Sequence, residues 1–314
     1  MTEIVSAMDV GGTHVSAANV DLTTRQILPG QHARMPLASN ATADQFVATL
    51  TACAAKLPTQ PARRWSIALP GPFDYERGIA LYEGVGKFDA LRGLDLRAAL
   101  SDLGDISFHN DAAAFGLGEW WAGAARGHRT VAGISLGTGV GSCFLREGRL
   151  VRNDPGLPPD GRIDLLPFEG RPLEETVSRQ AIRHAYAQAK TKTPPPDVRE
   201  IAHRARTGDH TASEAITRAM RALGTVLAPV LEAFDPTILV VGGSIAASWD
   251  LVAAPLRAAL SERIAVQPAT HPTEAPLLGA AYLATPTLDP QAPDRWTKLA
   301  TARPKASHDS TPRA

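Results

Sequence analysis

The chain alternates between short apolar runs typical of strands and longer segments with helical spacing. Residues 4–10 form an apolar run, and residues 14–20 alternate after a glycine turn, which predicts a strand, a tight turn and a returning strand. Apolar residues at helical spacing predict a helix over 43–56. The same rules predict further strands at 65–69, 131–136, 140–145 and 237–241, and helices at 111–125, 173–190, 197–206 and 212–233.

One hairpin pattern occurs twice along the chain. Residues 9–21 (DVGGTHVSAANVD) and residues 135–148 (SLGTGVGSCFLREG) each contain an apolar strand end, a turn with Gly and Thr, and an alternating strand. Repetition of a unit at a large separation predicts two related α/β halves. A third glycine pair, Gly242-Gly243, follows the strand predicted at 237–241.

The length of 314 residues is sufficient for two medium-sized domains. We expect a small N-terminal α/β domain over 1–110 and a larger C-terminal α/β domain over 111–289. Residues 290–314 contain Pro, Asp, Lys, Thr and Ser with few large apolar side chains, which predicts a flexible tail.

Composition and charge exclude several classes of function. The 32 Lys and Arg residues balance the 32 Asp and Glu residues, so net charge gives no indication of a nucleic-acid partner. No secretory leader and no apolar run near the roughly 18 residues of a membrane span is visible, which predicts a cytoplasmic protein without a membrane partner. The two cysteines, Cys53 and Cys143, are far apart and offer neither a disulfide framework nor a zinc site.

The two glycine turns are suited to phosphate binding. Glycine has no Cβ, so backbone N–H groups can approach phosphate oxygens closely. Either turn alone is also consistent with an ordinary hairpin, whereas the pair favours two cradles that face each other across a cleft. Neither matches the P-loop or the dinucleotide-binding fingerprint. The predicted cradle residues are Gly11, Gly12 and Thr13 in the first turn and Gly137, Thr138 and Gly139 in the second.

Two aspartates are candidates for the chemistry. Asp9 lies at a strand end, two residues before the first turn, where a carboxylate can hold Mg²⁺ directly or through water. A turn-capping role is the alternative. Asp111 begins the predicted helix over 111–125, and phosphoryl transfer needs a carboxylate that accepts the proton of the attacking hydroxyl. An N-cap role is equally consistent with its position.

Six segments follow one another as in the ROK family of sugar kinases and repressors, which the chain resembles from about residue 4 to residue 285. They are residues 9–21, 69–72 (LPGP), 109–127 (HNDAAAFGLGEWWAGAARG), 134–148, 239–245 (LVVGGSI) and 277–284 (LLGAAYLA). Bacterial glucokinases are the nearest comparison. The resemblance implies the two-domain actin-like ATPase fold of the actin and hexokinase superfamily, with ribonuclease H-like α/β halves and an interdomain cleft.

The resemblance also implies roles for individual residues. Asp111 matches the catalytic base, and Asn110 and Gly71 match sugar contacts. The two hairpins match the phosphate sites, and Gly242-Gly243 matches the adenosine site. The implied cofactors are ATP and Mg²⁺, the implied partner is a small-molecule sugar, and the family is often homodimeric. Glu119 and Gly123 match positions that support the helix after Asp111.

The chain departs from the family pattern in two places. Many members carry a cysteine-rich zinc loop that is absent here, so we expect no zinc. Members also bind the sugar through a Glu and a His where this chain has Arg162 and Asp164, whereas the later sugar-binding Glu is retained as Glu174. Because Arg only donates hydrogen bonds, this swap is expected to disfavour the original substrate. A modified hexose, an amino sugar or a C7-cyclitol is therefore an alternative to a plain hexose such as glucose.

Two non-catalytic functions are alternatives to the kinase. A sugar-sensing repressor of this family needs an N-terminal helix-turn-helix, whereas the first phosphate strand starts near residue 4, which disfavours that class. The presence of Asp9, Asp111 and both hairpins disfavours a pseudo-kinase, whereas the altered segment 161–164 keeps that alternative open. In the loop 83–89, Lys87 and Asp89 are candidates for substrate contact, although a solvated loop is the preferred interpretation. The pair Trp120-Trp121 is interpreted as core or interface.

Overall fold

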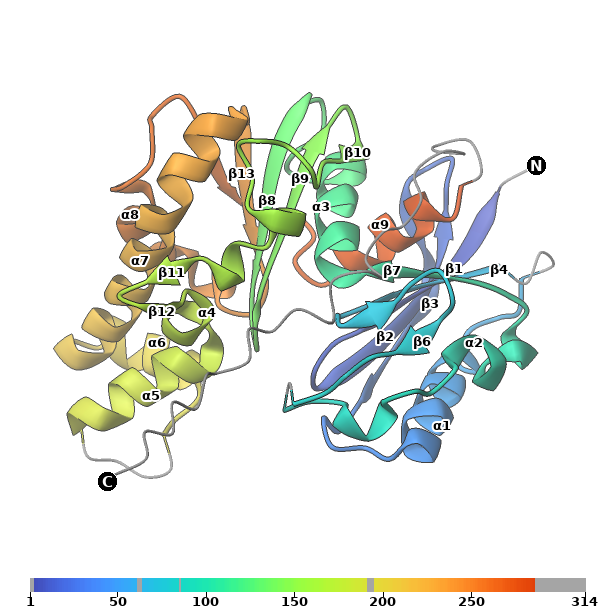
Figure 1. Cartoon of the computed structure of the whole chain (residues 1–314). Helices are drawn as coiled ribbons and strands as arrows, with labels where there is room; N and C mark the ends of the chain where they lie inside the picture. Colours follow the sequence, from blue (N-terminus) through green and yellow to red (C-terminus); the bar gives the residue numbers. More distant parts are fainter. Residues whose placement is uncertain (1–2, 61–63, 85, 191–194, 286–314) are drawn as a thin grey trace, which may run out of the picture.

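The chain forms two five-stranded sheets with the same internal order (Figure 1). The computed structural model describes residues 3–60, 64–84, 86–190 and 195–285. The first sheet has the order β3-β2-β1-β4-β7 and the second the order β10-β9-β8-β13-β14. In both sheets the first three strands of this order form an antiparallel meander. The last two strands run parallel to the central strand, which is β1 in the first sheet and β8 in the second. The repeated hairpins therefore belong to two halves of one topology, as the sequence predicted.

The strands of the first sheet are β1 (Ile4–Val10), β2 (His14–Asp21), β3 (Gln26–Pro36), β4 (Arg64–Leu69) and β7 (Asp105–Asn110). Those of the second sheet are β8 (Thr130–Leu136), β9 (Val140–Arg146), β10 (Arg149–Leu150), β13 (Ile238–Gly242) and β14 (Ala265–Pro268). Two small ribbons pair β5 (Phe73–Asp74) with β6 (Ile79–Ala80), and β11 (Pro167–Phe168) with β12 (Arg171–Pro172).

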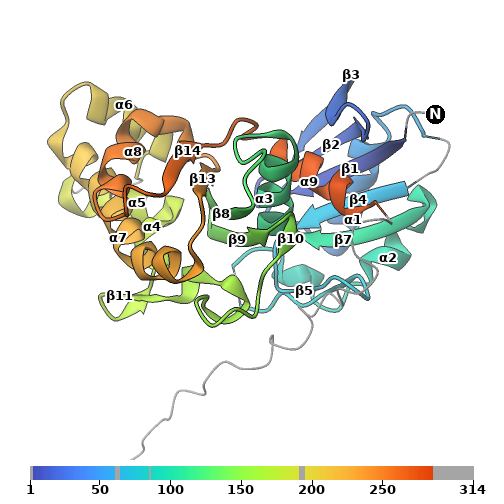
Figure 2. The same cartoon turned by 90° about the horizontal axis from the view of Figure 1, so that it is seen from above.

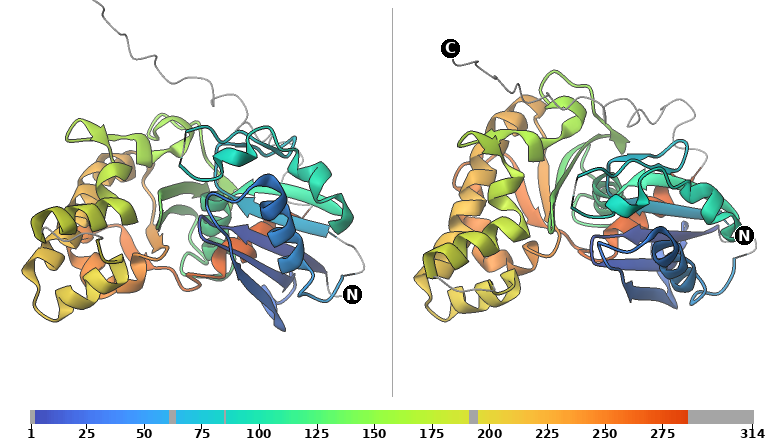
Figure 3. Two further views of the ribbon diagram at one scale, coloured as in Figure 1. Left: turned by 90° about the horizontal axis from the view of Figure 1, so that it is seen from below. Right: turned by 60° about the horizontal axis from the view of Figure 1, so that its bottom comes forward.

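Helices cover the outer faces of both sheets. On the first sheet these are α1 (Ala43–Ala54) and α2 (Leu96–Ala99). On the second they are α4 (Glu174–Val177), α5 (Arg179–Lys190), α6 (Val198–Arg206), α7 (His210–Phe234) and α8 (Trp249–Arg257), the yellow-green to orange helices of Figure 3. Each outer layer packs through its own apolar cluster.

Local sequence signals explain where several helices begin. Helix α1 starts at a capping box, in which the amide of Gln45 donates to the hydroxyl of Thr42 and the Gln45 side chain accepts from the Thr42 amide. Asp209 caps α7 by accepting from the amides of Thr211 and Ala212. These helices confirm the predictions made for 43–56 and 212–233.

The single helix predicted over 173–190 is wrong at one position. Ser178 has extended backbone angles (φ −69°, ψ 162°) and separates α4 from α5. Its hydroxyl accepts from the amide of Ala181, so Ser178 acts as a cap for α5. The next amide, that of Arg179, donates to the carbonyl of Gly137, which ties the break to the second glycine turn.

Two central helices, α3 (Asp111–Ala122) and α9 (Ala275–Leu283), lie between the sheets (Figure 2). Their backbones are in contact, because a Cβ at Gly118 would lie 1.9 Å from the carbonyl oxygen of Ala275 and one at Gly279 would lie 1.8 Å from that of Ala114. Only glycine fits at these two positions. An apolar cluster from the inner faces of both sheets surrounds the pair and joins the two halves.

None of the helices within the described ranges combines the length and the apolar composition that crossing a bilayer requires. The flexible tail predicted at 290–314 lies outside the described residues. The division of the chain at residue 110 and the cytoplasmic location stay predictions.

Candidate active site

The two candidate aspartates lie at the same edge of the first sheet. Strands β1, β4 and β7 run parallel, and in their register Asp9 lies beside Ala68, and Ala68 beside His109. Asp9 and Asp111 are therefore at the carboxyl ends of strands separated only by β4. This is the edge of an α/β sheet at which ligands characteristically bind.

Asn110, and not Asp111, is the N-cap of helix α3. Its side-chain carbonyl accepts from the amide of Ala113 over 3.0 Å. Asp111 is the first residue within the helix, and its carboxylate accepts from the amide of Ala112 over 2.8 Å. The capping role that spacing left open for Asp111 is thus filled by its neighbour.

The protein environment raises the pKa of both carboxyls. Burial raises the pKa of Asp111, and the ammonium of Lys87 opposes this shift. Burial and then the negative charge of Asp111 raise the pKa of Asp9 to about 7, against the opposing charge of Arg34. Two coupled carboxylates with little compensating positive charge form a site that a divalent cation would stabilise.

A tyrosine hydroxyl connects the predicted sugar contacts Gly71 and Asn110. The amide group of Asn110 donates to the hydroxyl of Tyr75 over 3.2 Å, and that hydroxyl donates to the carbonyl of Leu69 over 3.1 Å. A Cβ at Gly71 would lie 3.6 Å from the same hydroxyl. The structure therefore brings Gly71 and Asn110 together beside Asp111.

The two glycine turns face each other. A Cβ at Gly12 would lie 3.6 Å from the hydroxyl oxygen of Thr138 and 3.8 Å from its methyl carbon. Each turn is closed by a backbone hydrogen bond, from Gly11 to His14 over 2.9 Å and from Gly137 to Gly139 over 3.0 Å. This opposition is the geometric condition for a nucleotide site built from both halves. The side chain of Thr13 is hydrogen-bonded to the ring of His14 within the first turn.

The third glycine pair lies beside the second turn. Gly243 has a positive φ of 83°, and a Cβ there would lie 2.3 Å from the carbonyl oxygen of Leu136, so glycine is required. The amide of Ile245 donates to the same carbonyl over 3.1 Å. Gly242 and Gly243 thus lead the chain out of β13 next to Gly137, whose Cβ position lies 3.9 Å from the hydroxyl of Ser244.

The three charged side chains that were predicted to bind the sugar also lie together. Arg162 donates through Nε to one carboxylate oxygen of Asp164 over 3.1 Å and through a terminal nitrogen to the other. Glu174 accepts from the amide of Val140 over 2.9 Å, and its carboxylate lies against Gly139. The two substituted residues therefore form an ion pair with each other, next to the second turn.

The charge around Arg162 keeps it protonated. Burial lowers its pKa, but the hydrogen bonds and charge of Asp164 raise it, and so do the charges of Glu174 and Asp160, with a raised pKa as the result. Asp164 is only 6% exposed, so its carboxylate depends on Arg162 for compensation.

Strand β9 connects this cluster to the start of helix α3. A Cβ at Gly141 would lie 2.8 Å from the Cβ of Ala112, so β9 passes directly against the first turn of α3. Val140, the preceding residue, is the one that binds Glu174. Two neighbouring residues of β9 therefore contact the two parts of the site: Val140 binds Glu174, and Gly141 packs against Ala112, the residue after Asp111.

Sequence reasoning missed the aromatic part of this site. Tyr82 donates to the carbonyl of Pro70 over 2.8 Å, and burial together with the charge of Asp111 raises the pKa of its phenol. Lys87, interpreted as part of a solvated loop, is only partly exposed and acts on the charge of Asp111. The signal available was that both residues follow the LPGP segment within 15 residues.

No three His, Cys, Asp or Glu side chains gather as a metal-binding group within the described part of the chain. Cys53 and Cys143 are both buried, in different halves of the molecule. The expectation that zinc is absent stays a prediction. Mg²⁺ in nucleotide sites is held by one or two carboxylates together with phosphates and water, which is compatible with Asp9.

Comparison with known proteins gives consistent relatives. The sequence model of the ROK family matches residues 5–286. A glucokinase of Thermotoga maritima is 29% identical over 61% of this chain and 67% of its own length, and a beta-glucoside kinase of Listeria monocytogenes is 26% identical over 88% and 96%. The crystal structure of a ROK family glucokinase from Streptomyces griseus, in complex with glucose and AMPPNP, is 26% identical. It superimposes with a TM-score of 0.74 over 90% of this chain and 99% of its own.

The family match extends across both sheets and both glycine turns. The predicted actin-like, two-domain α/β fold is confirmed by the shared architecture of the solved ROK structures. Because the family match covers nearly all of the described residues, the chain belongs to the ROK family.

Proposed function

We propose that this protein is an ATP-dependent kinase that phosphorylates a hydroxyl group of a hexose or a hexose-like substrate. The observation that carries the proposal is the opposition of Gly12 and Thr138, beside an edge that holds both Asp9 and Asp111. The relatives named above are sugar kinases, which supports the same reaction class.

In this proposal Asp111 is the general base. Its carboxylate is oriented by the amide of Ala112, and burial raises its pKa toward the range in which a carboxylate accepts a proton effectively. Phosphoryl transfer requires positioning and charge stabilisation more than covalent chemistry. Asn110 and Gly71, connected through Tyr75, position the acceptor hydroxyl next to Asp111.

The two turns and Asp9 form the nucleotide side. Residues 11–13 and 137–139 offer backbone N–H groups to phosphate oxygens, and Gly242-Gly243 offers an unobstructed backbone to adenosine. Asp9, directly or through water, would hold Mg²⁺, which when bound neutralises phosphate charge. The raised pKa of Asp9 is the observation that supports this assignment, because a cation would relieve its repulsion with Asp111.

A second candidate function is a kinase for a modified sugar, an amino sugar or a C7-cyclitol. The ion pair of Arg162 with Asp164 favours it, since a Glu and a His would present acceptors that a guanidinium cannot provide. Glu174, bound to the amide of Val140, contributes the remaining carboxylate of the acceptor site.

The test is a coupled ATP assay across hexoses, N-acetylated hexosamines and cyclitols. The variant Asp111→Asn is expected to bind the acceptor normally but to lose about 10²-fold or more in kcat, the scale of a removed general base. The matched control is Asp105→Asn, an exposed aspartate at the opposite end of β7. Full turnover in Asp111→Asn would refute the assignment.

A further inference from the structure

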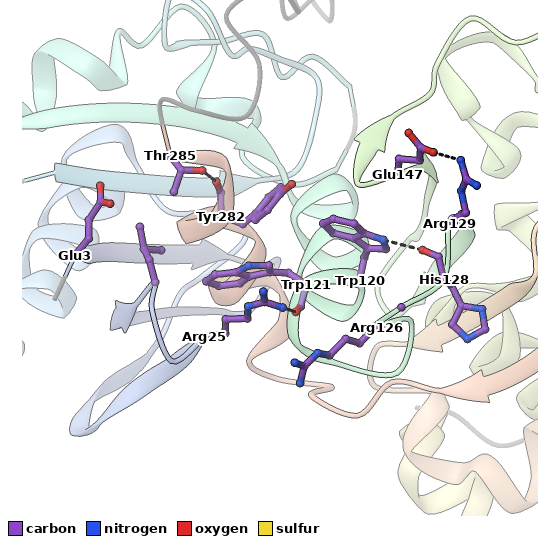
Figure 4. Close-up of a pocket in the computed structure, with 12 residues that line it drawn as sticks. Glu3, Arg25, Trp120, Trp121, Arg126, His128, Arg129, Glu147, Tyr282 and Thr285 are labelled. Atoms are coloured by element: carbon purple, nitrogen blue, oxygen red, sulfur yellow. Dashed lines mark hydrogen bonds and ion pairs between the residues drawn. The ribbon is translucent and has the colours of Figure 1, made fainter.

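A cavity lies at the end of helix α3 opposite Asp111 (Figure 4). It has a volume of about 580 Å³, within the range of small-molecule sites. The twelve residues of α3 give a length of roughly 18 Å at about 1.5 Å per residue, so this cavity is separate from the glycine turns. Its wall comes from both halves of the molecule, with Arg25 from the turn between β2 and β3 and Glu147 from the turn between β9 and β10.

The cavity is built around three aromatic side chains. Tyr282 packs against both Trp120 and Trp121, with ring centroids 5.7 Å apart in each pair. Trp120 remains partly exposed, and its ring nitrogen donates to the carbonyl of His128 over 2.9 Å. This fixes the indole so that part of its apolar surface is offered to a ring-shaped ligand.

The charged groups of the wall leave an excess of positive charge. Glu147 is paired with Arg129, and Glu3 is paired with Arg64 over 3.3 Å. Arg25, by contrast, donates to the backbone carbonyl of Trp121 over 3.0 Å and lies 5.7 Å from the centroid of that ring.

Arg126 adds to this positive side. It is exposed, and within the described residues it has no carboxylate partner. In Figure 4 both arginines lie below the aromatic side chains, Arg25 against Trp121 and Arg126 on the loop that follows α3. Guanidinium groups that are not neutralised by carboxylates are well suited to bind phosphate.

We propose that this cavity binds a small phosphorylated ring compound, with its phosphate on Arg25 and Arg126 and its ring against Trp120. Sugar phosphates and nucleoside monophosphates share this chemistry.

Within the described residues Leu165 alone is a large hydrophobic side chain with high exposure, so the cavity is not part of a wide apolar surface suited to a protein partner.

A ligand in this cavity would contact the same helix that carries Asp111 at its other end. The wall of the cavity joins the ends of α3 and α9 to the first and second sheets. A ligand that contacts both halves would favour one relative position of the sheets. The proposal concerns binding and does not depend on the proposed kinase reaction.

The experiment is calorimetric titration of the full chain with glucose 6-phosphate and, separately, with AMP. The nucleotide site of the cleft is first saturated with a non-hydrolysable ATP analogue, and each titration is repeated with Arg126→Ala to separate the cavity from the acceptor site. We expect one of the two phosphates to bind under these conditions and to change tryptophan fluorescence. The compound that binds identifies the source of the phosphate.

Variants separate this cavity from the cleft. Arg126→Ala is expected to weaken binding at least tenfold, and Trp120→Leu to remove most of the fluorescence change. Arg199→Ala, an exposed arginine on α6, is the matched control and should bind as the parent does. The proposal is overturned if neither phosphate binds with the nucleotide site saturated, or if Arg126→Ala binds as tightly as the parent chain.

Discussion

Arg162 and Asp164 are bound to each other through two hydrogen bonds, one of them 3.1 Å from Nε to a carboxylate oxygen. Either substitution alone would place an unmatched group beside Glu174. Together they form a compensated pair in which Asp164 is buried and Arg162 is half-exposed. The change from the family pattern is therefore a coupled one.

This coupling predicts non-additive variants. Arg162→Leu leaves a buried carboxylate without its partner and is expected to lower the free energy of unfolding by about 1–3 kcal/mol. Asp164→Leu should cost a similar amount, while the double variant should recover much of the loss because neither charge remains. Urea titration of the four proteins measures the coupling. Additive losses would show that the two side chains act independently.

The sequence predicted which segments form this site but not which of their side chains contact each other. The turns at 11–13 and 137–139 were identified because glycine and threonine recur after apolar strands. The contact between Arg162 and Asp164 was not predicted, because the sequence does not show that the two substituted side chains meet. Hydrogen bonds of side chains two residues apart depend on the backbone path, which here includes a kink with positive φ at Asp160.

Two other misses have local causes. Strand β3 was not predicted because Pro29, Gly30 and several polar residues obscure its alternation. The position of Asp111 was consistent with either a base or an N-cap, and Asn110 was not predicted as a cap; the backbone angles of Asn110 (φ −70°, ψ 137°) identify it as the N-cap. Pattern alone carries no information on which of two adjacent polar residues leaves the helix.

Lys87 should set the acidic limb of the pH–rate profile. Its charge lowers the pKa of Asp111 against the effect of burial, so Lys87→Met should raise that pKa further. The base would then be protonated at higher pH, and the acidic limb of kcat/KM should move upward in pH. Rates measured from pH 5 to 9 test this, with Lys56→Met, an exposed lysine just after the end of helix α1, as the control. A limb that stays in place or moves downward would contradict the interaction.

Asp9 should govern the requirement for Mg²⁺. We expect Asp9→Asn to raise the Mg²⁺ concentration for half-maximal activity by about tenfold or more, because a carboxylate ligand is replaced by a neutral amide. Activity titrations at fixed ATP measure this. Asp44→Asn, an exposed aspartate on α1, serves as the control. An unchanged Mg²⁺ requirement would leave Asp9 with the turn-capping role instead.

Two glycines of one turn should differ in their tolerance of alanine. A Cβ at Gly139 would lie 2.6 Å from a carboxylate oxygen of Glu174, whereas a Cβ at Gly137 meets nothing closer than the Ser244 hydroxyl at 3.9 Å. Gly139→Ala must displace Glu174 from the Val140 amide and is expected to lower stability by about 1 kcal/mol. Gly137→Ala should change stability by less than about 0.5 kcal/mol in the absence of nucleotide. Thermal unfolding without ligands compares them, and equal losses would show that Glu174 is not held against Gly139.

Glu119 should stabilise the far end of α3 through a single buried carboxylate. It is fully buried and accepts from three backbone amides, those of Ala124 over 2.7 Å, Thr270 over 3.1 Å and His271 over 2.8 Å. An amide side chain can present only one oxygen to these donors, so Glu119→Gln turns an N–H group toward at least one of them. We expect a loss of about 2–3 kcal/mol in the free energy of unfolding.

The control for Glu119 is Glu262→Gln, an exposed glutamate that follows α8, which should unfold as the parent does. The carboxylate also fixes the turn after α3, because a Cβ at Gly123 would lie 2.1 Å from its oxygen. Gly123→Ala must therefore displace Glu119 and should reproduce much of the loss seen in Glu119→Gln. In the double variant the two losses should not add, since both break the same contacts. Full additivity would place the effect of Gly123 in the backbone of the turn and not in the carboxylate that it adjoins.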